Sequence, residues 1–408
     1  MRILFIHRAF PAQFGRLAFE LTRRHGCDCR FFVEHLSSCP TPSQEMLDRV
    51  RVQFLPAAPA RNNESIPWPQ GYMHALERGQ RVFDATVAMT DWRPDLIVGH
   101  GGLIPTFLLR EMFDCPIIDY CEYYFAQSHR DLTYRLDLPP TEPAPFFPRC
   151  INAATLVNLV ESDAGYAPTR WQQQSFPQRF WPKIEVHNDG IDTELYRPRA
   201  VPRLLSGQIV PSGTRIVTFA ARGLESVRGF DLFMKIAQRI LRERSDVLFA
   251  VAGDESVYYG WDRLFTGQQS FKQWAFAQGN YDLSRFIFLG HVTPPQLADI
   301  FCLSDLHIYL SVPFVLSWSL LDAMACGSVI LAADTPPVQE VVTSGRNGLL
   351  APLFDTDQLA SLALQVLADP GAFRPLGQAA RSLMEENYSL DVAIPALNEF
   401  FQRKASRQ

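Results

Sequence analysis

Short apolar runs alternate with longer amphipathic stretches through the first half of the chain. The runs are uninterrupted, as strands buried on both faces of a parallel sheet are, and the stretches between them place apolar residues at helical spacing. Strands are expected at residues 2–7, 30–35, 95–100 and 115–124, and helices at 72–91, 103–113 and 150–178. Another helical pattern carries Leu17, Phe19 and Leu21 and stops at Gly26. This alternation predicts a doubly wound α/β sheet.

The same alternation restarts in the second half of the chain. Strands are expected at residues 215–221, 246–254, 285–292, 305–311 and 328–334, and helices at 230–243, 316–326 and, as a pair, after 357. Between the halves, residues 197–213 cluster Pro, Gly and Ser without apolar periodicity, which predicts a linker. Two α/β halves joined by one linker predict a cleft between two domains, and ligands bind beyond the carboxyl ends of the strands.

Length and composition agree with two globular domains. The chain has 408 residues, more than one ordinary domain contains. Hydrophobic residues make up 47% of it and charged residues 20%, which excludes a largely disordered chain. The formal net charge of −5 gives no support for nucleic-acid binding.

Cysteine spacing and hydropathy indicate a cytoplasmic protein. The 8 cysteines include no C-x-x-C pair, and Cys27-x-Cys29 lacks a second pair at zinc spacing, so no metal site is predicted. The opening run RILFIH is too short for the apolar part of a signal peptide, and no run approaches the roughly 18 apolar residues of a membrane span. The sequence therefore predicts at most peripheral contact with the inner face of a membrane.

The first strand-to-helix loop offers a single glycine. The G-x-G-x-x-G fingerprint is absent, which argues against a nicotinamide enzyme. Gly15, in FPAQFGR, lies where a helix N-terminus could present backbone N–H groups to an anion. A simple turn glycine is the alternative, and both interpretations stay open.

Two arginines follow an expected strand in the segment AARGLESVRGFD (220–231). Arg222 is expected at the strand's end, and Arg228 comes six residues later, just before Gly229 and a helix. Two guanidinium groups in such positions can hold a diphosphate through bidentate hydrogen bonds and stay charged at any working pH. Two solvated surface arginines are the alternative.

The segment SVPFVLSWSLLDAMACG (311–327) predicts a helix that follows a strand end. Its start, at Val315, Leu316 and Ser317, is expected to present free N–H groups to the cleft, with Asp322 further along the helix. A carboxylate there can accept hydrogen bonds from the two hydroxyls of a ribose. A local polar contact or a solvated helix face is the alternative for Asp322.

Six segments, in order, resemble landmarks of family 4 of the retaining glycosyltransferases, which have the GT-B architecture of two facing Rossmann-like domains. They are the stretch from VHNDGID to Pro198 (186–198), RGLESVRG (222–229), VAGD (251–254), FLGHV (288–292), DAMACG (322–327) and the stretch from DTPP to NGLL (334–350). The resemblance covers about residues 180–395. The first half is matched mainly by its strand–helix rhythm and by PDLIVGHGG (94–102).

The resemblance also implies a division of the chain. Residues 1–196 would bind the acceptor, 197–213 would be the linker, and 214–387 would bind the nucleotide-sugar donor. The segment LMEENYSLD (383–391) resembles the start of a helix that crosses back, so residues 388–408 would belong to the first domain.

Residue roles are implied for the matched positions. Arg222 and Arg228 would hold the donor diphosphate and stabilise its charge as it leaves. Other donor contacts are implied for His291 and Val292 at the nucleotide base, Asp322 at the ribose, Val315, Leu316 and Ser317 at phosphate or sugar, and Gly15 in a loop near the donor. No metal and no cofactor beyond the nucleoside diphosphate sugar is implied, because basic side chains and helix dipoles supply the electrostatic stabilisation.

Three positions depart from the family pattern. The family often carries two glutamates eight residues apart around this helix, and here those positions hold Phe314 and Asp322. The first of these acids usually contacts the donor sugar. Glu122 stands where the family commonly has a histidine, and it could bind the donor sugar or orient the acceptor hydroxyl. A structural hydrogen bond is the alternative for Glu122.

The expected cleft also includes residues whose role the sequence leaves open. His100, at the end of DLIVGH, is expected to line the cleft as a catalytic group, with a satisfied core histidine as the alternative. An aromatic platform for a sugar or lipid acceptor is conceivable, although core packing is the commoner fate of such residues. Its members would be Trp68, Tyr123, Tyr124, Phe146 and Phe147.

The sequence thus predicts a retaining glycosyltransferase that moves a sugar from a nucleoside diphosphate sugar to a hydroxyl of a saccharide or lipid-linked acceptor. No protein nucleophile is evident, which suits front-face substitution assisted by the leaving diphosphate. A degenerate nucleotide-sugar-binding protein with little turnover is the alternative, because of Phe314 and Asp322. An epimerase or phosphorylase of the same architecture is less consistent, since Lys235 lies inside an expected helix and is poorly placed to hold a cofactor.

Overall fold

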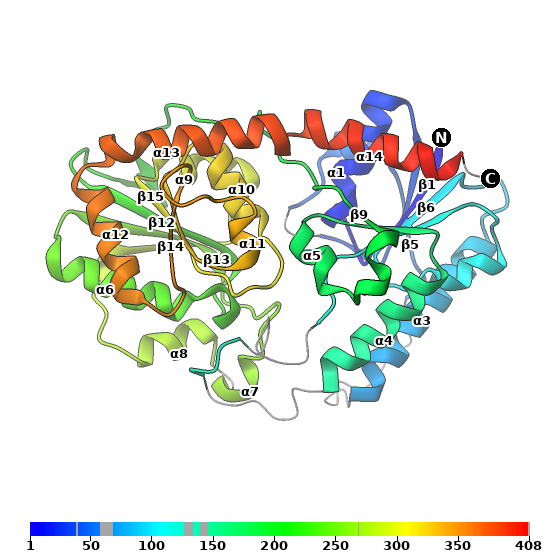
Figure 1. The fold of residues 1–408 in the computed structure, drawn as a ribbon, viewed down its shortest axis with the longest axis horizontal. Coiled ribbons are helices and arrows are strands. Elements are labelled where there is room, and N and C mark those ends of the chain that lie inside the picture. Colours follow the sequence, from blue (N-terminus) through cyan, green and yellow to red (C-terminus); the bar gives the residue numbers. More distant parts are fainter. Residues whose placement is uncertain (38–39, 58–67, 126–133, 139–145, 268, 407–408) are drawn as a thin grey trace. The chain divides into compact units, whose positions relative to one another are not determined.

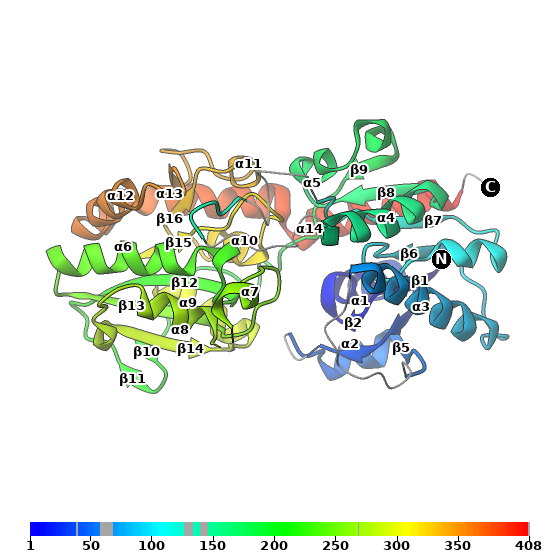
Figure 2. The same cartoon turned by 90° about the horizontal axis from the view of Figure 1, so that it is seen from below.

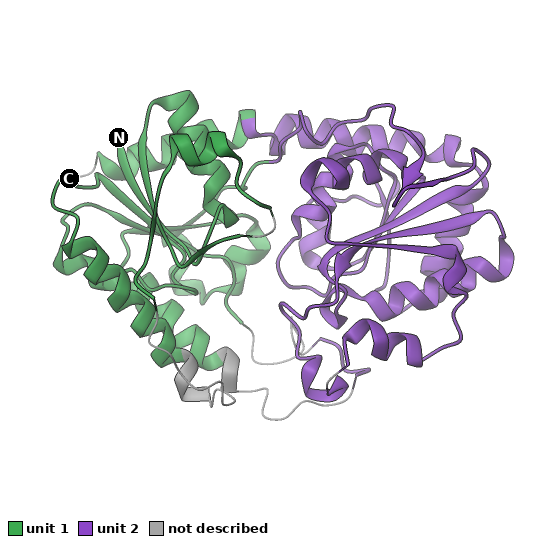
Figure 3. Ribbon diagram, turned by 180° about the vertical axis from the view of Figure 1, so that it is seen from behind, with its two compact units in different colours: residues 1–127, 142–190, 391–408 green, residues 128–141, 191–390 purple. Residues whose placement is uncertain are grey.

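A computed structural model of the chain describes residues 1–37, 40–57, 68–125, 134–138, 146–267 and 269–406, with the backbone alone at 68–71 and 146–148 (Figure 1). The chain forms two compact units. Unit 1 comprises residues 1–127, 142–190 and 391–408, and unit 2 comprises residues 128–141 and 191–390 (Figure 3). Each unit is a parallel sheet flanked by helices, as the doubly wound pattern of the sequence predicts.

Unit 1 is built on a sheet that has seven parallel strands within the described residues. In spatial order they are β5 (Arg51–Phe54), β3 (Asp28–Val33), β1 (Arg2–Ile6), β6 (Leu96–Gly99), β7 (Ile117–Tyr120), β8 (Ala164–Ala167) and β9 (Ile184–Val186). A short parallel pair joins β2 (Ala9–Phe10) to β4 (His35–Leu36). The helices are α1 (Ala12–His25), α2 (Gln44–Arg49), α3 (Trp68–Val87), α4 (Phe146–Glu161), α5 (Arg170–Ser175) and the 3-10 helices η1 (Phe107–Glu111) and η3 (Gln178–Lys183).

The last helix, α14 (Leu390–Ala405), packs on unit 1. Arg24, at the end of α1, donates a hydrogen bond of 2.5 Å to Asp391 at the start of α14. Further along, Arg403 donates to both carboxylate oxygens of Glu185 in β9, and the ring of Phe400 lies 6.0 Å from that of Tyr166 in β8. The C-terminal helix therefore packs against β8 and β9, the last two strands in the spatial order of this sheet.

Unit 2 is built on a sheet that has six parallel strands within the described residues. In spatial order they are β14 (Phe286–Gly290), β13 (Val247–Asp254), β12 (Arg215–Gly223), β15 (Leu306–Tyr309), β16 (Ile330–Ala333) and β17 (Leu349–Ala351), beside a separate hairpin of β10 (Leu204–Leu205) and β11 (Gln208–Ile209). The helices are α6 (Phe230–Glu243), α7 (Arg263–Thr266), α8 (Phe271–Ala277), α9 (Pro294–Leu303), α10 (Trp318–Ala325), α11 (Pro336–Gln339), α12 (Thr356–Ala368), α13 (Pro370–Leu383), the 3-10 helices η4 (Ser226–Arg228) and η5 (Leu283–Arg285), and the π-helix η6 (Met384–Tyr388).

Alternate residues of β12 pack against different helices, because successive side chains of a strand point to opposite faces. Phe219 packs on α6, with its ring 4.7 Å from that of Phe233. Ala220, the next residue, belongs instead to the cluster that includes Leu320 of α10. On the α6 side, α12 lies alongside α6 (Figure 2). The strand is therefore buried on both faces, which is why its sequence is continuously apolar.

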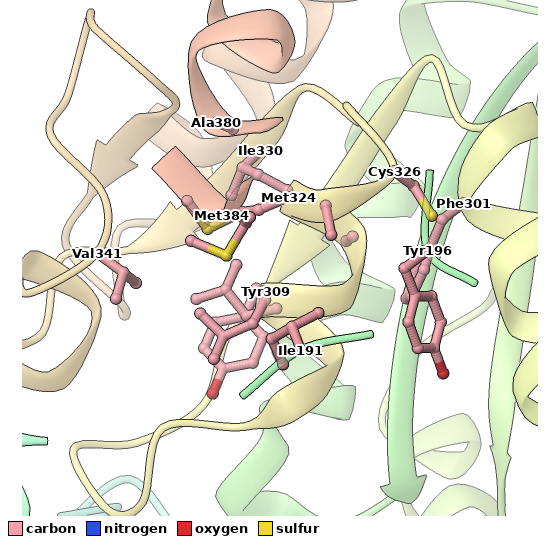
Figure 4. Packing of buried hydrophobic residues seen from close by; sticks show 14 of the residues in the cluster. Ile191, Tyr196, Phe301, Tyr309, Met324, Cys326, Ile330, Val341, Ala380 and Met384 are labelled. Carbon is pink, nitrogen blue, oxygen red and sulfur yellow. The ribbon is translucent and has the colours of Figure 1, made fainter. Parts of the chain in front are cut away.

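The largest described cluster in unit 2 joins the α9–α10 side of the sheet to the end of α13. Met324 of α10 and Met384, which follows α13, lie beside Ile330 of β16 (Figure 4). Tyr309, the last residue of β15, and Ala380 of α13 complete this part of the packing. The helix that carries Asp322 is thus fixed to the sheet along its apolar side.

The helix predicted over residues 150–178 is wrong, because a strand interrupts it. Helix α4 ends at Glu161, where the Ser162 N–H and hydroxyl donate to the carbonyls of Asn158 and Leu159. The next residues form β8, which pairs with β7 and β9, and the helix resumes as α5. The small residues of AGYA fit the sheet interior, and this tertiary pairing outweighs their helical propensity.

Residues 197–213, expected to be a linker, lie within unit 2. The unit boundary before them falls between Gly190 and Ile191. Leu205 and Val210 are buried in a cluster with Ile216 of β12, so this Pro- and Gly-rich stretch is packed against the sheet rather than free of it.

Parallel pairing brings the carboxyl ends of all strands of a sheet to one edge. In unit 1 the chain proceeds outward from β1 through β3 to β5 and then returns to β6, so the strand order reverses between β1 and β6. In unit 2 the same reversal falls between β12 and β15. Open α/β sheets bind ligands where the order reverses, which directs attention to the residues that follow these four strands.

Substitution of Gly229 tests how tightly the loop after β12 is packed. Its φ is +70°, and a Cβ there would lie 2.6 Å from the carbonyl oxygen of Leu310. Gly345 has a similar φ of +77°, but a Cβ there would meet nothing within 4 Å. We expect Gly345→Ala to lower the free energy of unfolding by about 1 kcal/mol and Gly229→Ala to lower it by at least about twice that. If urea unfolding shows the same loss of unfolding free energy for both variants, the loop after β12 can shift to accommodate a Cβ at residue 229 at little cost.

Candidate functional site

The loop between β12 and α6 places two arginines at the point where the strand order of unit 2 reverses. Arg222 lies near the end of β12 and is exposed. Arg228 ends the 3-10 turn η4 and is buried. Its Nη1 donates a 3.1 Å hydrogen bond to the hydroxyl of Ser311, which follows β15, the neighbour of β12. The structure therefore brings both predicted arginines to the carboxyl edge of this sheet.

Each of these guanidinium groups lies over a tyrosine ring. Residues 258 and 259 belong to the loop that follows β13. Arg222 lies 4.2 Å from the centroid of Tyr258, and Arg228 lies 4.9 Å from that of Tyr259. The Phe314 ring lies 5.7 Å from that of Tyr259. Cation–π contacts of this kind are each worth about 0.5–2 kcal/mol and restrict the rotation of a long side chain.

Glu225 ties the tyrosine loop to the arginine loop. Its Oε2 accepts hydrogen bonds of 3.0, 2.9 and 2.9 Å from the backbone N–H groups of Tyr258, Tyr259 and Gly260. The side chain is fully buried, and burial raises the pKa of this carboxyl. One acid thus sets the positions of both rings that cover the guanidinium groups.

Asp262 also fixes the loop that carries Arg228. It is fully buried and accepts hydrogen bonds from the N–H of Ser226, at 2.8 Å, and from the Ser226 hydroxyl. Burial raises the pKa of Asp262 to about 6, although the bonds from Ser226 oppose the rise. The turn that carries Arg228 is therefore fixed by buried acids on either side of it in the sequence.

The predicted residues of the 311–327 segment line up along the start of α10. Val315 and Leu316 have buried side chains, so any ligand contact they make would be through the backbone. Ser317 is the N-cap of α10, and its own N–H donates to the Tyr309 hydroxyl at 3.2 Å. Asp322 is buried in the second turn of the helix.

The residues predicted at the nucleotide base follow β14. Gly290 ends the strand in a left-handed conformation, His291 is exposed and Val292 is half-buried against the α9 side of the core. In the sheet, β13 separates β14 from β12. These residues share the carboxyl edge with Arg222 but lie two strands away.

A polar cluster lies at the carboxyl edge of the unit 1 sheet and includes both residues predicted there. His100 follows β6, and its Nε2 lies 3.1 Å from Oε2 of Glu122, which follows β7. The other carboxylate oxygen of Glu122 accepts a 3.1 Å hydrogen bond from Gln13 of α1. The His7 ring lies 5.5 Å from that of His100. Burial and the neighbouring His100 lower the pKa of His7 to about 3, so His7 is neutral at physiological pH.

Gly15 lies inside the first turn of α1 rather than in the loop before it. A Cβ there would lie 2.1 Å from Cβ of Pro11 and 3.3 Å from the Phe10 ring. Close packing of the helix start on the preceding residues is therefore sufficient to require a glycine.

Several residues of these clusters were not anticipated from the sequence. Glu225 lies within the segment that holds both arginines, and a buried acid beside two arginines could have been suspected there. Tyr258 and Tyr259 come four and five residues after a strand end, a position that also points to this edge. His7 ends the first predicted strand, so its position also points to the edge of a sheet. Asp262 carries no local signal, because only the fold brings it to its partners.

The aromatic platform receives little support from the described residues. Tyr123 is buried, and the Tyr124 ring packs 5.8 Å from Phe176. The side chains of Trp68, Phe146 and Phe147 lie outside the described residues.

Two further properties concern the described part of the chain as a whole. Within it, no cluster of three or more His, Cys, Asp or Glu side chains could hold a metal ion. Among the same residues, none of the helices combines the length and apolar character that crossing a bilayer requires.

Comparison with known families gives two consecutive matches. Residues 34–196 match the model of the glycosyl transferase family 4 group, and residues 214–369 match that of the glycosyl transferases group 1. Among curated proteins, the D-inositol 3-phosphate glycosyltransferase of Kribbella flavida is 28% identical over 204 residues, 48% of this chain and 46% of that protein. The enzyme of the same name from Gordonia bronchialis is 24% identical over 394 residues, 93% of this chain and 81% of that protein.

Solved structures with the GT-B-like fold resemble the whole chain. Sucrose-phosphate synthase from Thermosynechococcus elongatus matches with a TM-score of 0.77 and 17% identity, over 99% of this chain and 98% of that one. The Anabaena protein HepE, solved in complex with UDP-glucose, matches with a TM-score of 0.71 and 15% identity, over 99% of this chain and 100% of that one. At these identities the likeness concerns the fold.

The raised pKa of Asp262 makes a prediction about stability and pH. Between about pH 4 and pH 6 the folded protein holds a proton at Asp262 that the unfolded chain has released, so this carboxyl makes the protein less stable as the pH rises through that window. Asp262→Asn removes this dependence. We expect the stability of the variant, relative to the unchanged protein, to improve from pH 4 to pH 7 by about 2–3 kcal/mol, measured by thermal unfolding.

Asp282→Asn is the matched control for this measurement. The Ser284 hydroxyl donates to this exposed carboxyl and lowers its pKa. The weak contribution of Asp282 to the pH dependence of stability therefore has the opposite sign to that of Asp262. A relative stability of Asp262→Asn that stays constant with pH would show that the Asp262 carboxyl titrates normally.

Proposed function

This chain belongs to family 4 (group 1) of the glycosyltransferases, which transfer a sugar from a nucleotide sugar, and on that premise we propose that Arg222 and Arg228 hold the diphosphate of its donor. The observation that carries the proposal is the pair of guanidinium groups at the carboxyl edge of unit 2. One is exposed and one is buried, and each is covered by a tyrosine ring. Guanidinium groups match phosphate oxygens bidentately and stay charged when buried.

Preorganisation supports a catalytic role for this pair as well as a binding role. The loop that carries Arg228 is fixed by buried acids, so its charge does not need to reorganise when the sugar–phosphate bond breaks. The two guanidinium groups would stabilise the charge that develops on the leaving diphosphate. A protein nucleophile is not required if the acceptor hydroxyl attacks the face that the diphosphate leaves and gives its proton to that diphosphate. Front-face attack of this kind leads to transfer with retention of configuration.

The rest of the donor is assigned to the same edge of unit 2. We propose that Asp322 binds the ribose, that the backbone at residues 315–317 contacts phosphate or sugar, and that His291 and Val292 lie beside the base. Uracil is the base that we propose, because HepE was solved with UDP-glucose. Thermal shifts with UDP, GDP, ADP and TDP test this choice, and a larger shift with another diphosphate would replace it.

The polar cluster of unit 1 is proposed to bind the acceptor hydroxyl, of a saccharide or a lipid-linked saccharide. Glu122 is half-buried and held by His100 and Gln13, so its carboxylate has a fixed orientation. A fixed carboxylate can accept the hydrogen bond of a hydroxyl and direct its lone pair.

Arg228→Ala tests the diphosphate assignment. We expect turnover with the donor to fall at least tenfold, since removing one charge-stabilising donor typically costs about 3 kcal/mol or more. The affinity for UDP should fall as well, measured by calorimetry. Arg239→Ala is the control: this arginine, on the exposed side of α6, pairs with Asp357, and its loss should leave both quantities within about twofold. Unchanged kinetics in a folded Arg228→Ala variant would overturn the assignment.

Glu122→Gln tests the acceptor assignment separately. The substitution keeps the shape of the side chain and removes its charge. We expect transfer to the acceptor to fall at least about tenfold, while UDP affinity and the slow hydrolysis of the donor by water stay within about twofold. A parallel loss of UDP affinity would move Glu122 to the donor site.

The same assays address the alternative of a binding protein with little turnover. Phe314 stands at the position where the family often has an acid, and it packs on Tyr259 beside Arg228. Tight UDP binding without hydrolysis or transfer from any UDP-sugar of a panel would favour that alternative.

A further inference from the structure

We propose that Arg135 is a positioning residue for Arg228, a role that rests on the proposed function of Arg228 in holding the diphosphate. Arg135 belongs to the connection between β7 and α4, which are elements of unit 1. Residues 134–138 of that connection are nevertheless part of unit 2. The Arg135 side chain is only 4% exposed.

All five N–H donors of the Arg135 guanidinium are used. Two hydrogen bonds go to Asp137, from Nε and Nη2, each 2.8 Å long. Two go to Asp231, from Nη1 at 3.0 Å and from Nη2 at 2.7 Å. The fifth goes from Nη1 to the carbonyl oxygen of Ser226 at 2.9 Å. A guanidinium has five donors in a planar fork, so no donor of Arg135 remains unsatisfied.

The partners of Arg135 lie on both sides of Arg228 in the sequence. The Ser226 carbonyl belongs to the turn that carries Arg228, and Asp231 lies in the first turn of α6. Arg135 therefore joins the beginning and the end of the loop across the buried Arg228. Asp262 also holds Ser226, through its N–H and hydroxyl, and Arg135 links Ser226 to Asp231.

A second set of contacts holds Arg135 itself in place. The Tyr134 ring stacks on the Phe354 ring, with centroids 5.7 Å apart and an interplanar angle of 16°. The Arg135 guanidinium lies 5.9 Å from the centroid of Phe354. Asp137, two residues on, forms the bidentate contact described above. The segment is thus anchored on unit 2 independently of the arginine loop.

Loss of the Arg135 fork would leave a buried charge without its partner. The Asp231 side chain is 5% exposed, and a buried carboxylate that loses its cation is strongly unfavourable. The loop can relieve this by moving Asp231 toward water or by rearranging its turn. Either movement displaces Arg228, which lies between the two points that Arg135 holds.

Arg135→Lys is the first variant to examine. Lysine keeps the positive charge, but its single ammonium group lacks the planar fork that reaches two carboxylates and a carbonyl together. The probes are UDP and uridine, or the diphosphate and nucleoside of whichever base gives the largest thermal shift. We expect the affinity of Arg135→Lys for UDP to fall at least about tenfold and that for uridine to stay within about twofold, measured by calorimetry.

A double variant separates positioning from general stability. If Arg135 acts through Arg228, the UDP affinity of Arg135→Lys/Arg228→Ala should equal that of Arg228→Ala within about twofold. Multiplied losses would overturn the proposal, as would an unchanged UDP affinity in Arg135→Lys or equal losses for UDP and uridine.

Arg381→Lys controls for the loss of a well-bonded arginine elsewhere in unit 2. Arg381 donates to the carbonyls of Thr193, Tyr196 and Ala325. Its substitution should lower the melting temperature and leave the ratio of UDP to uridine affinity unchanged. A ratio that falls as far in Arg381→Lys as in Arg135→Lys would overturn the proposal.

Asp231→Asn serves if Arg135→Lys does not fold. It keeps the shape of the partner and removes its charge, and the same selective loss of UDP affinity is expected. A selective loss supports the proposal, and an unchanged affinity overturns it. The proposed function fails on a different result, namely a folded Arg228→Ala variant that binds UDP normally, whatever the Arg135 variants do.

Discussion

A buried charge needs a partner inside the protein, and this requirement shapes the loop between β12 and α6. Arg228, Glu225, Asp231 and Asp262 are all buried. Arg228 donates a hydrogen bond to Ser311. The three acids accept hydrogen bonds, Glu225 from backbone N–H groups, Asp231 from Arg135 and Asp262 from Ser226. Since leaving a buried charge without a partner is strongly unfavourable, these contacts restrict the conformation of the loop. A rigid array of charges is what stabilisation of a developing phosphate charge requires.

The parallel sheets supply the framework on which these pairings can form. Every strand of a parallel sheet ends at the same edge, so residues far apart in the sequence meet there. Arg228 and Ser311 come together at the edge of unit 2 in this way, and His100 and Glu122 do so in unit 1. The apolar faces of β12, packed on α6 and on α10, hold that edge against the core.

Local patterns in the sequence were sufficient for most of the framework. The apolar runs predicted β1, β3, β6 and β7 of unit 1 and β12 to β16 of unit 2, but not β5 or β17. The helix over residues 230–243 has the predicted bounds. The pattern failed where tertiary pairing decided the outcome, as in the AGYA segment that became β8. The two arginines could be predicted because a strand end and a helix start flank them. Arg135 could not be predicted. One acidic partner, Asp231, lies 96 residues away in the sequence, and the other, Asp137, is only 2 residues away and so gives no information about the fold.

The path of the chain between its two units limits the order in which they can fold. The backbone passes from one unit to the other at residues 127–128, 141–142, 190–191 and 390–391. Neither unit is therefore a single continuous segment that a ribosome could release and fold ahead of the other. A fragment limited to residues 191–390 would emerge with Asp231 buried and lacking its guanidinium. Gene fusions, truncations and domain exchanges within this architecture would have to carry the short 134–138 segment along with the unit it completes.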